Sequence, residues 1–337
     1  MENKKITTIG EALIDWVCLD KTLDLNKAET FIKAPGGAPA NVAVGLAKLE
    51  YPVQFVGGFA DDIFGPWLKD FLLSFNVDIS KSVDIKNSNT RNAYLMTDQN
   101  GNRVLKGFSN QCCADSMLQL NNINMDAITS SPLVYFGSLL QADIKSRYTL
   151  NNIINAVVTD NIVIYDPNLR LCLWPDTGEA IKVISDTFKM VDIVKLSDDE
   201  ITLITGINDI ETAAKKIFSE FQFKLLVITL GGEGSLYFNK QGSGHIKPFV
   251  VKPLEMTGAG DAFVAGLIGG LYDIIIQEEK NYNNLDDIIE NLPSEKLEKI
   301  MVRANALGAL TTTKPGATSA LPTKSELEQF MSAISYL

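Results

Sequence analysis

The sequence has one histidine and no pair of cysteines at a metal-binding or redox spacing. His245 lies in the Gly-rich stretch KQGSGHIKP, which predicts a turn, so a Ser-His triad or a His-rich metal site is not indicated. None of the four cysteines forms a Cys-x-x-Cys motif: Cys18, Cys112, Cys113 and Cys172. Acid–base chemistry, if the chain is an enzyme, must therefore fall to Asp, Glu, Lys or Tyr.

A basic surplus and a long apolar run are also missing. The chain carries 41 acidic and 30 basic residues, a net charge of −11, which argues against a nucleic-acid or anionic-membrane partner. Its longest apolar run, Ala262–Tyr272, is shorter than the roughly 20 residues of a membrane-spanning helix. The start MENKKITTIG contains no apolar signal-peptide core. We therefore expect a cytoplasmic protein with no membrane partner.

Short β-branched runs alternate with segments of helical spacing along most of the chain. The runs are KKITTIG, VQFVGG, PLVYFGS, NIVIYD, VDIVKLS and LLVITLGG, and the helical segments include 40–49, 65–75, 143–158 and 210–221. Continuous apolar strands that alternate with helices predict an α/β fold, with a mostly parallel central sheet and helices on both faces. In such sheets ligands bind beyond the carboxyl ends of the strands.

A small antiparallel element is predicted beside that sheet. Two short runs in Asn92–Phe108 flank Asn100-Gly101, a strong hairpin signal, and Trp16–Ile32 could add further strands. This hairpin could be an ordinary surface feature or a lid over an active site. Because the sequence shows no internal repeat and no low-complexity linker, we expect one domain over residues 1–337.

The segment Thr257-Gly258-Ala259-Gly260-Asp261 places two glycines and a carboxylate at the start of an apolar helix. Such a turn exposes backbone amides and the positive end of the helix dipole to an anion. Asp261 could be a catalytic base beside that anion, or only a helix cap. The chain has no Walker P-loop, and Phe263 stands where a dinucleotide fingerprint needs its third glycine.

Seven segments in order resemble the ribokinase-like (PfkB) carbohydrate kinases, and within that family the fructokinases. They cover essentially the full chain: GEALIDW (10–16), PGGAPANVAVGLAKL (35–49), VGGFADDIFG (56–65), DPNLRLCLW (166–174), VKLSDDEITLITG (194–206), TGAGDAF (257–263) and ANALGALTTTKPGATSALPT (304–323). The resemblance implies one kinase domain with lid segments at about 12–34 and 91–112, and a homodimer that could form through the lid.

The resemblance also assigns residues to the sugar and to the reaction. Asp261 would be the general base, and the amides of Gly258, Ala259 and Gly260 would hold the transferring phosphoryl group. The sugar would be bound by Asp15, Gly36, Gly37, Asn41 and Arg170. From the residues alone, the paired glycines could be only a turn into a helix that begins at Asn41, and Arg170 could be a surface ion pair.

The same resemblance assigns the nucleotide side. ATP would be bound by Ser197, Thr229, Gly231, Gly234, Gly258, Gly260 and Asn305. Glu200 would support Mg²⁺ through water, with Ser197 where many relatives have Asn. On its own, Thr-x-Gly after a strand is common turn chemistry.

Three departures from the family pattern bear on cations and on substrate. Glu255-Met256 stands where the family has Asp-Thr in a monovalent-cation loop, so the longer carboxylate could coordinate K⁺ or displace it. Ala60 replaces a usual glycine, and Ser109 stands where the typical lid segment has Arg.

The sequence thus predicts an ATP-dependent kinase that phosphorylates the 6-hydroxyl of fructose, with 2-keto-3-deoxygluconate or another sugar as the alternative substrate. A fructokinase-like protein without catalysis, acting as a binding or regulatory partner, is the alternative of another class.

Overall fold

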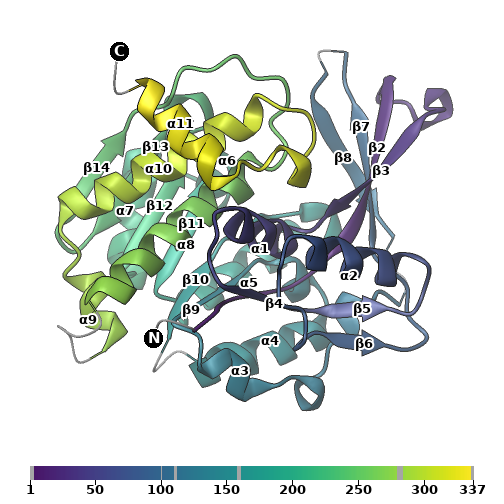
Figure 1. Ribbon diagram of the computed structural model, residues 1–337, viewed down its shortest axis with the longest axis horizontal. Coiled ribbons are helices and arrows are strands. Elements are labelled where there is room, and N and C mark those ends of the chain that lie inside the picture. The colour runs from purple at the N-terminus through teal and green to yellow at the C-terminus, as the bar shows by residue number, and fades with distance from the viewer. Residues whose placement is uncertain (1–3, 100, 110–111, 158–160, 279–283, 335–337) are drawn as a thin grey trace.

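The computed structural model of the protein describes residues 4–99, 101–109, 112–157, 161–278 and 284–334 (Figure 1). Its central feature is an eight-stranded sheet in the order β14-β13-β12-β11-β10-β9-β1-β4, in which the six strands from β12 to β4 are parallel. These strands are β1 (Ile6–Ile9), β4 (Val53–Val56), β9 (Leu133–Phe136), β10 (Ile162–Tyr165), β11 (Ile193–Ser197), β12 (Leu225–Thr229), β13 (Ser235–Asn239) and β14 (Gly242–Ile246). The six predicted apolar runs form the six parallel strands.

Helices cover both faces of this sheet. Successive strand residues point to opposite sides, so the apolar strands present hydrophobic side chains on both faces. Ile162 and Ile164 of β10 join one apolar cluster, and Val163 and Tyr165 join the other. The first cluster includes residues of α1 (Ala38–Lys48), α2 (Phe64–Ser74), α8 (Ala259–Glu278), α9 (Leu285–Glu290), α10 (Ser294–Thr312) and α11 (Lys324–Ile334). The second includes residues of α3 (Met125–Thr129), α4 (Ile144–Val157), α5 (Thr177–Phe188), α6 (Asp198–Thr205) and α7 (Ile210–Phe221). The predicted fold class is confirmed.

Local sequence explains where several helices begin. The side chains of Asp176 and Asp209 cap α5 and α7 by accepting a hydrogen bond from a backbone N–H in the first turn. A proline in the first turn of α1 fits where no intrahelical N–H is needed. This helix begins at Ala38, three residues before the start expected from Asn41.

The long helix α8 lies in the core. By length and composition it could cross a membrane, with a mean hydropathy of 1.6 over its most apolar window, so the apolar segment is longer than the sequence analysis expected. However, 72% of that window is buried inside the protein. Burial among α1 and α10 accounts for its apolar character, since a helix that is hydrophobic all round is a core helix in a soluble fold or a membrane span.

A second, four-stranded sheet stands at the edge of the molecule (Figure 1), and we call it the lid. Its order is β3-β2-β7-β8, with β2 (Leu13–Lys21), β3 (Phe31–Gly36), β7 (Asn92–Thr97) and β8 (Arg103–Phe108). The β7–β8 hairpin is present as predicted, although Asn100 of its turn lies outside the described residues. The lid is not wholly antiparallel, because β2 and β7 pair in parallel. A two-stranded sheet of β5 (Gly58–Ala60) and β6 (Val83–Ile85) was not predicted.

Candidate active site

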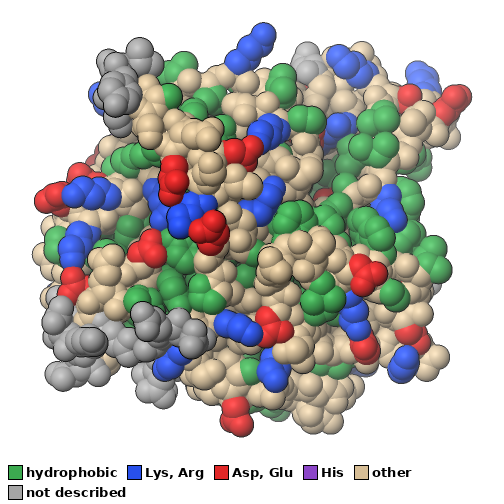
Figure 2. All heavy atoms as spheres, viewed as in Figure 1, with side chains coloured by type: hydrophobic (Ala, Val, Ile, Leu, Met, Phe, Trp, Pro, Cys, Tyr) green, Lys and Arg blue, Asp and Glu red, His purple; other side chains and the backbone are tan. Residues whose placement is uncertain are grey.

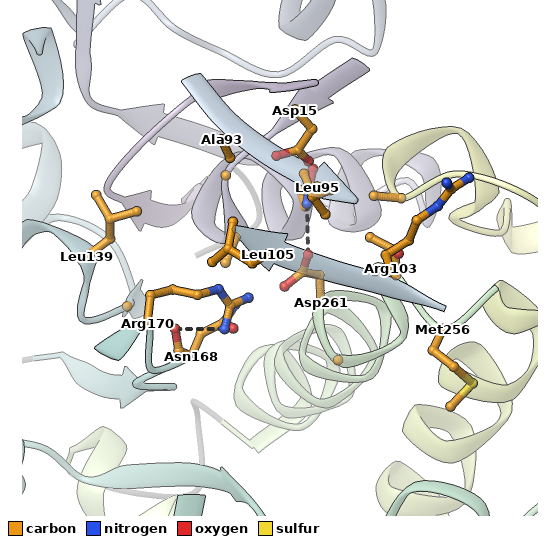
Figure 3. Close-up of a pocket in the computed structure, with 18 of the residues that line it drawn as sticks. Asp15, Ala93, Leu95, Arg103, Leu105, Leu139, Asn168, Arg170, Met256 and Asp261 are labelled. Atoms are coloured by element: carbon orange, nitrogen blue, oxygen red, sulfur yellow. Dashed lines mark hydrogen bonds between the residues drawn. The ribbon is translucent and has the colours of Figure 1, made fainter. Parts of the chain in front are cut away.

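A cavity of about 970 Å³ lies between the lid and the carboxyl ends of the central strands. Its lid side carries the apolar residues Ala93, Leu95, Leu105 and Phe108 together with Asp15 and Arg103. Its other side carries charged groups that follow β10, lie on β11 and lie at the start of α8. Figure 3 shows Asp15, Arg170 and Asp261 reaching into the same space from three different elements. The cavity is of the size that small-molecule sites occupy.

Asp261 lies in the first turn of α8, and only 8% of it is exposed. The preceding Gly258 has a φ of +81°, a left-handed conformation that favours glycine and turns the chain into the helix. Asn41 donates a hydrogen bond from Nδ2 to the Asp261 carboxylate at 2.8 Å, and its own Oδ1 accepts one from the Thr318 hydroxyl at 2.7 Å. Burial raises the pKa of Asp261, while the Asn41 hydrogen bond opposes that rise.

Asp15 of β2 enters the same cavity from the lid. A Cβ atom at Gly36 would lie 2.3 Å from Asp15 Oδ2, so only glycine leaves room for this carboxylate. Burial, followed by the negative charge of Asp261, raises the pKa of Asp15 to about 7, and the Arg170 guanidinium opposes the rise. Arg170 follows β10, lines the cavity, and donates from Nη1 to the backbone oxygens of Asn168 and Leu169 at 3.2 Å. Its guanidinium group therefore contributes a positive charge to the cavity.

Asp166 and Lys195 form a buried ion pair at the bottom of the cavity, and the sequence analysis missed their roles. Lys195 Nζ lies 3.1 Å from Asp166 Oδ2, and their side chains are 8% and 1% exposed. Burial raises the pKa of Asp166 to about 6 against the opposing charge of Lys195. Burial alone would lower the pKa of Lys195, but Asp166 and Glu200 outweigh it and the pKa is raised. For Lys195 the available signal was a lysine between the apolar residues Val194 and Leu196 of the run VDIVKLS.

Glu11 is a second buried carboxyl that sequence reasoning missed. It lines the cavity with 4% of its surface exposed, and its Oε1 accepts a hydrogen bond from Ala38 N at 3.0 Å, at the start of α1. Burial raises its pKa to about 8. At neutral pH the Glu11 carboxyl is thus largely protonated.

Glu200 and Ser197 form a capping box at the start of α6. Ser197 Oγ accepts from Glu200 N at 3.2 Å, and Glu200 Oε2 accepts from Ser197 N at 2.8 Å. The other carboxylate oxygen, Oε1, accepts from Leu169 N at 2.7 Å and so joins the ends of β10 and β11. Within the described part of the chain, no group of three or more His, Cys, Asp or Glu side chains is arranged to hold a metal ion.

The remaining residues that were predicted to bind ATP lie outside the lining of this cavity. Thr229 ends β12, and Gly231 and Gly234 border the short turn that follows it. Asn305 of α10 is 8% exposed and donates from Nδ2 to the backbone oxygens of Ile246 and Lys247 at 3.2 and 3.3 Å. Its amide therefore fastens α10 to the end of β14.

Glu255 connects the lid to the turn at 257–261, which is predicted to bind an anion and which we call the anion loop. Its Oε1 lies 3.4 Å from Arg103 Nε on β8, and its Oε2 accepts from Gly316 N at 3.1 Å. Arg103 also donates from Nη1 to the Cys18 backbone oxygen on β2 at 2.9 Å. The carboxylate expected at a monovalent-cation site thus pairs with a guanidinium here.

The cavity therefore brings together only part of the predicted site. Predicted residues that line it are Asp15, Gly37, Asn41, Arg170, Glu255, Gly258, Gly260 and Asp261. Gly36 lies against Asp15, and Ala259, the first residue of α8, stands between Gly258 and Gly260. Predicted residues outside the lining are Ser197, Glu200, Thr229, Gly231, Gly234 and Asn305.

Comparisons with known proteins agree on one family. The family model "pfkB family carbohydrate kinase" matches residues 3–324. A curated relative, probable fructokinase-4 of Arabidopsis thaliana, is 34% identical over 334 residues, covering 98% of this chain and 97% of its own.

Two solved structures share the fold over nearly all of both chains. Fructokinase of Xylella fastidiosa with bound ATP is 26% identical with a TM-score of 0.85, and the match covers 99% of each chain. Fructokinase of Vibrio cholerae O395 with fructose, ADP and a calcium ion is 28% identical with a TM-score of 0.80, covering 98% of this chain and 99% of its own. A double mutant of that enzyme was solved with fructose, ADP and a potassium ion.

Proposed function

Since the chain belongs to the pfkB family of carbohydrate kinases, we propose that it transfers the γ-phosphoryl group of ATP to fructose and forms fructose 6-phosphate. The observation that carries the proposal is the position of Asp261, buried at the amino end of α8 in a cavity that also holds Asp15 and Arg170. Carboxylates and a guanidinium suit a ligand rich in hydroxyl groups.

Asp261 accepts the proton of the attacking primary hydroxyl in this proposal. Asn41 holds one carboxylate oxygen, so the other is free to face the sugar. A raised pKa makes the carboxylate a better base at neutral pH than an ordinary aspartate. The amides of the 258–260 loop stabilise the negative charge of the phosphoryl group, which is the main task in phosphoryl transfer.

ATP approaches from the side of Ser197, Thr229, Gly231, Gly234 and Asn305 in this proposal. Glu200 fits a supporting role for Mg²⁺, because each of its oxygens accepts one backbone N–H and keeps a second lone pair for a metal-bound water. Bound with the nucleotide, Mg²⁺ would neutralise phosphate charge.

We propose further that catalysis does not depend on K⁺. The support is the Glu255 carboxylate, which already pairs with Arg103 and with Gly316 N–H. Equal turnover in K⁺ and Na⁺ buffers is expected, and an activation of tenfold or more by K⁺ would contradict this part of the proposal.

The experiment is an ADP-release assay with ATP and Mg²⁺ on fructose, other hexoses, ribose, nucleosides and 2-keto-3-deoxygluconate. We expect fructose to be the best substrate and Asp261→Asn to lower turnover at least about a hundredfold with unchanged folding. Preference for 2-keto-3-deoxygluconate would reassign the substrate, which the cationic Arg170 could accommodate. ATP binding without turnover on any substrate would favour a non-catalytic role.

The proposal includes a homodimer formed through the lid. Each lid strand exposes one large apolar side chain: Leu19, Ile32, Tyr94 and Val104, with exposed fractions between 36% and 47%. Figure 2 shows hydrophobic side chains gathered on the side of the molecule where the lid stands. A dimer mass in solution that is lost in Ile32→Lys would support it, and a monomer at all concentrations would overturn it. A cytoplasmic location is proposed from the four free cysteines.

A further inference from the structure

We propose that Lys195 is a further catalytic residue whose ammonium group contacts the transferring phosphoryl group, and that Asp166 is the positioning residue that holds it there. The inference rests on the proposed kinase function and deepens it. It starts from the ion pair at the bottom of the cavity, which no predicted role explains.

Lys195 lies next to the start of α8. Lys195 lines the cavity near the carboxyl end of β11, and Asp166 follows the neighbouring strand β10. A Cβ atom at Gly260 would lie 3.7 Å from Lys195 Nζ, so the ammonium stands beside the loop that opens α8. Backbone amides at that helix start and the ammonium therefore face the same region, where an anion would be stabilised by both.

The lining of the cavity carries more carboxyl groups than cations. Five carboxyl groups line the cavity. Glu11 is largely protonated and Glu255 is paired with Arg103, so Asp15, Asp166 and Asp261 remain as the carboxyl groups that can add negative charge. The cations that remain on this lining are Arg170 and Lys195. A nucleotide triphosphate adds several negative charges, which would be repelled unless a cation stands close to them. Lys195 is the one beside Gly260.

A purely structural role explains the pair poorly. Burying two charges is expensive, and well-packed apolar residues in their place are often neutral or stabilising. Ile193, on the same face of β11, and Val227, the residue paired with Lys195 on β12, are fully buried in the first apolar cluster, so an apolar side chain at position 195 would suit the strand. The pair occurs instead where the cavity reaches the sheet.

The chemical step balances with Lys195 as a charge and not as an acid. The sugar oxygen forms a bond to the γ-phosphorus, the bond to the β–γ bridging oxygen breaks, and its electron pair leaves with ADP. The hydroxyl proton goes to Asp261. Lys195 remains protonated throughout, because Asp166 and Glu200 hold its pKa above the usual value.

The test compares Lys195→Met with a matched control, Lys224→Met. Lys224 is also a largely buried lysine, 14% exposed, and pairs with Asp192 and Asp286, but it does not line the cavity. We expect Lys195→Met to lower kcat about 10²–10³-fold. Its affinity for ATP should fall at least about tenfold relative to its affinity for ADP, because only ATP carries the γ-phosphate. Lys224→Met should lower the melting temperature and leave this ratio unchanged.

Two further variants keep the inference falsifiable if Lys195→Met does not fold. Lys195→Gln retains a donor to Asp166 without the charge and should lose the ATP preference in the same way. Lys195→Arg, which keeps the charge, should recover part of kcat. Equal loss of ATP and ADP affinity in Lys195→Gln, or a kcat near wild type, would overturn the proposal. Nucleotide binding needs no turnover, so a wild-type protein inactive on fructose would refute the proposed function without deciding this inference.

Discussion

The pKa of the Asp15 carboxyl group lies close to neutral pH because the group is buried in the cavity. Burial and the nearby charge of Asp261 raise its pKa to about 7, while the Arg170 guanidinium opposes the rise. A group with such a pKa changes its charge across the physiological range. When protonated, Asp15 offers one acceptor oxygen fewer to a sugar hydroxyl.

We therefore predict that kcat/KM for fructose rises as the pH increases through about 7. Asp15→Asn should lower kcat/KM and move the remaining acid limb to lower pH, because one negative charge beside Asp261 is gone. A pH–rate profile of the free enzyme measures this. Asp20→Asn, on the same strand but outside the cavity, is the control. An unchanged limb in Asp15→Asn would contradict the assignment.

Gly36 and Asp15 give a second prediction for a single position. Because a Cβ at Gly36 would overlap the Asp15 carboxylate, Gly36→Ala should displace that carboxylate and reduce kcat/KM for fructose roughly a hundredfold. Gly107→Ala, also in the lid, meets no atom within 4 Å and should be near wild type. Steady-state kinetics and the melting temperatures of both variants would decide it. A Gly36→Ala enzyme with normal KM would show that Asp15 does not hold the sugar.

Residues to which the family resemblance assigns a role could be placed from the sequence, whereas buried charges without an assigned role could not. Asp261, Asn41 and Asp15 are far apart in the chain, and their motifs were enough to predict that they share one site. Lys195 and Glu11 also lie inside two of these motifs, but no role was assigned to them, and a sequence alone cannot tell a buried charge from a solvated one. The contact between Glu200 Oε1 and Leu169 N was equally hidden, since it depends on how β10 and β11 end side by side.

At the scale of elements, the lid and the anion loop are joined by one ion pair. Arg103 of β8 reaches Glu255, two residues before Thr257, and also binds the backbone of β2. Both side chains are largely buried, at 17% and 11% exposed, so solvent screens the pair less than a surface pair. The pair thereby links the lid to the turn at 257–261, for which we propose binding of the phosphoryl group.

Breaking this pair should loosen the lid. We predict that Arg103→Met raises KM for fructose about tenfold with a smaller effect on kcat, because the lid retains the sugar more than it takes part in chemistry. Glu255→Gln should act similarly, and the double variant should be no worse than either single one. Lys106→Met, exposed on the same strand, is the control. Additive losses in the double variant would show that the two side chains act separately.

The elements themselves were predictable where the sequence pattern is periodic and buried. Each parallel strand is a short apolar run because both of its faces are covered by helices. The parallel pairing of β2 with β7 could not be predicted, because it joins strands separated by more than 70 residues and depends on the tertiary fold. Strands β13 and β14 were missed for a related reason: as an antiparallel edge with polar and glycine residues, they lack the continuous apolar pattern.

For the whole molecule, the buried carboxyl groups set how stability depends on pH. Burial raises the pKa of Glu11 to about 8, of Asp15 to about 7 and of Asp166 to about 6. The folded protein therefore keeps protons that the unfolded chain has already released between about pH 5 and pH 8. Since the unfolded state binds fewer protons in this window, the free energy of unfolding falls as the pH rises.

Carboxyl groups whose pKa is lowered do not reverse this trend. Glu326, which pairs with Lys314, has its pKa lowered to about 2, so its stabilising contribution is fully present above about pH 4.5 and is lost only in acid. It is therefore constant between pH 5 and pH 8. Burial also raises the pKa of Asp192, which lies outside the cavity, so the slope in that window belongs to buried carboxyl groups, most of which line the cavity.

We predict that the ligand-free protein melts at a higher temperature at pH 5.5 than at pH 8. Glu11→Gln should flatten this slope and stabilise the protein at pH 8 by a few kcal/mol in order of magnitude, because a neutral amide can still accept the Ala38 N–H and is not forced to ionise. Calorimetry across the pH range measures both effects. Glu220→Gln, exposed on α7, should leave the slope unchanged. An unchanged dependence of the melting temperature on pH in Glu11→Gln would contradict the role of Glu11. Another carboxyl group of the cavity would then hold the retained proton, and Asp15→Asn tests whether it is Asp15.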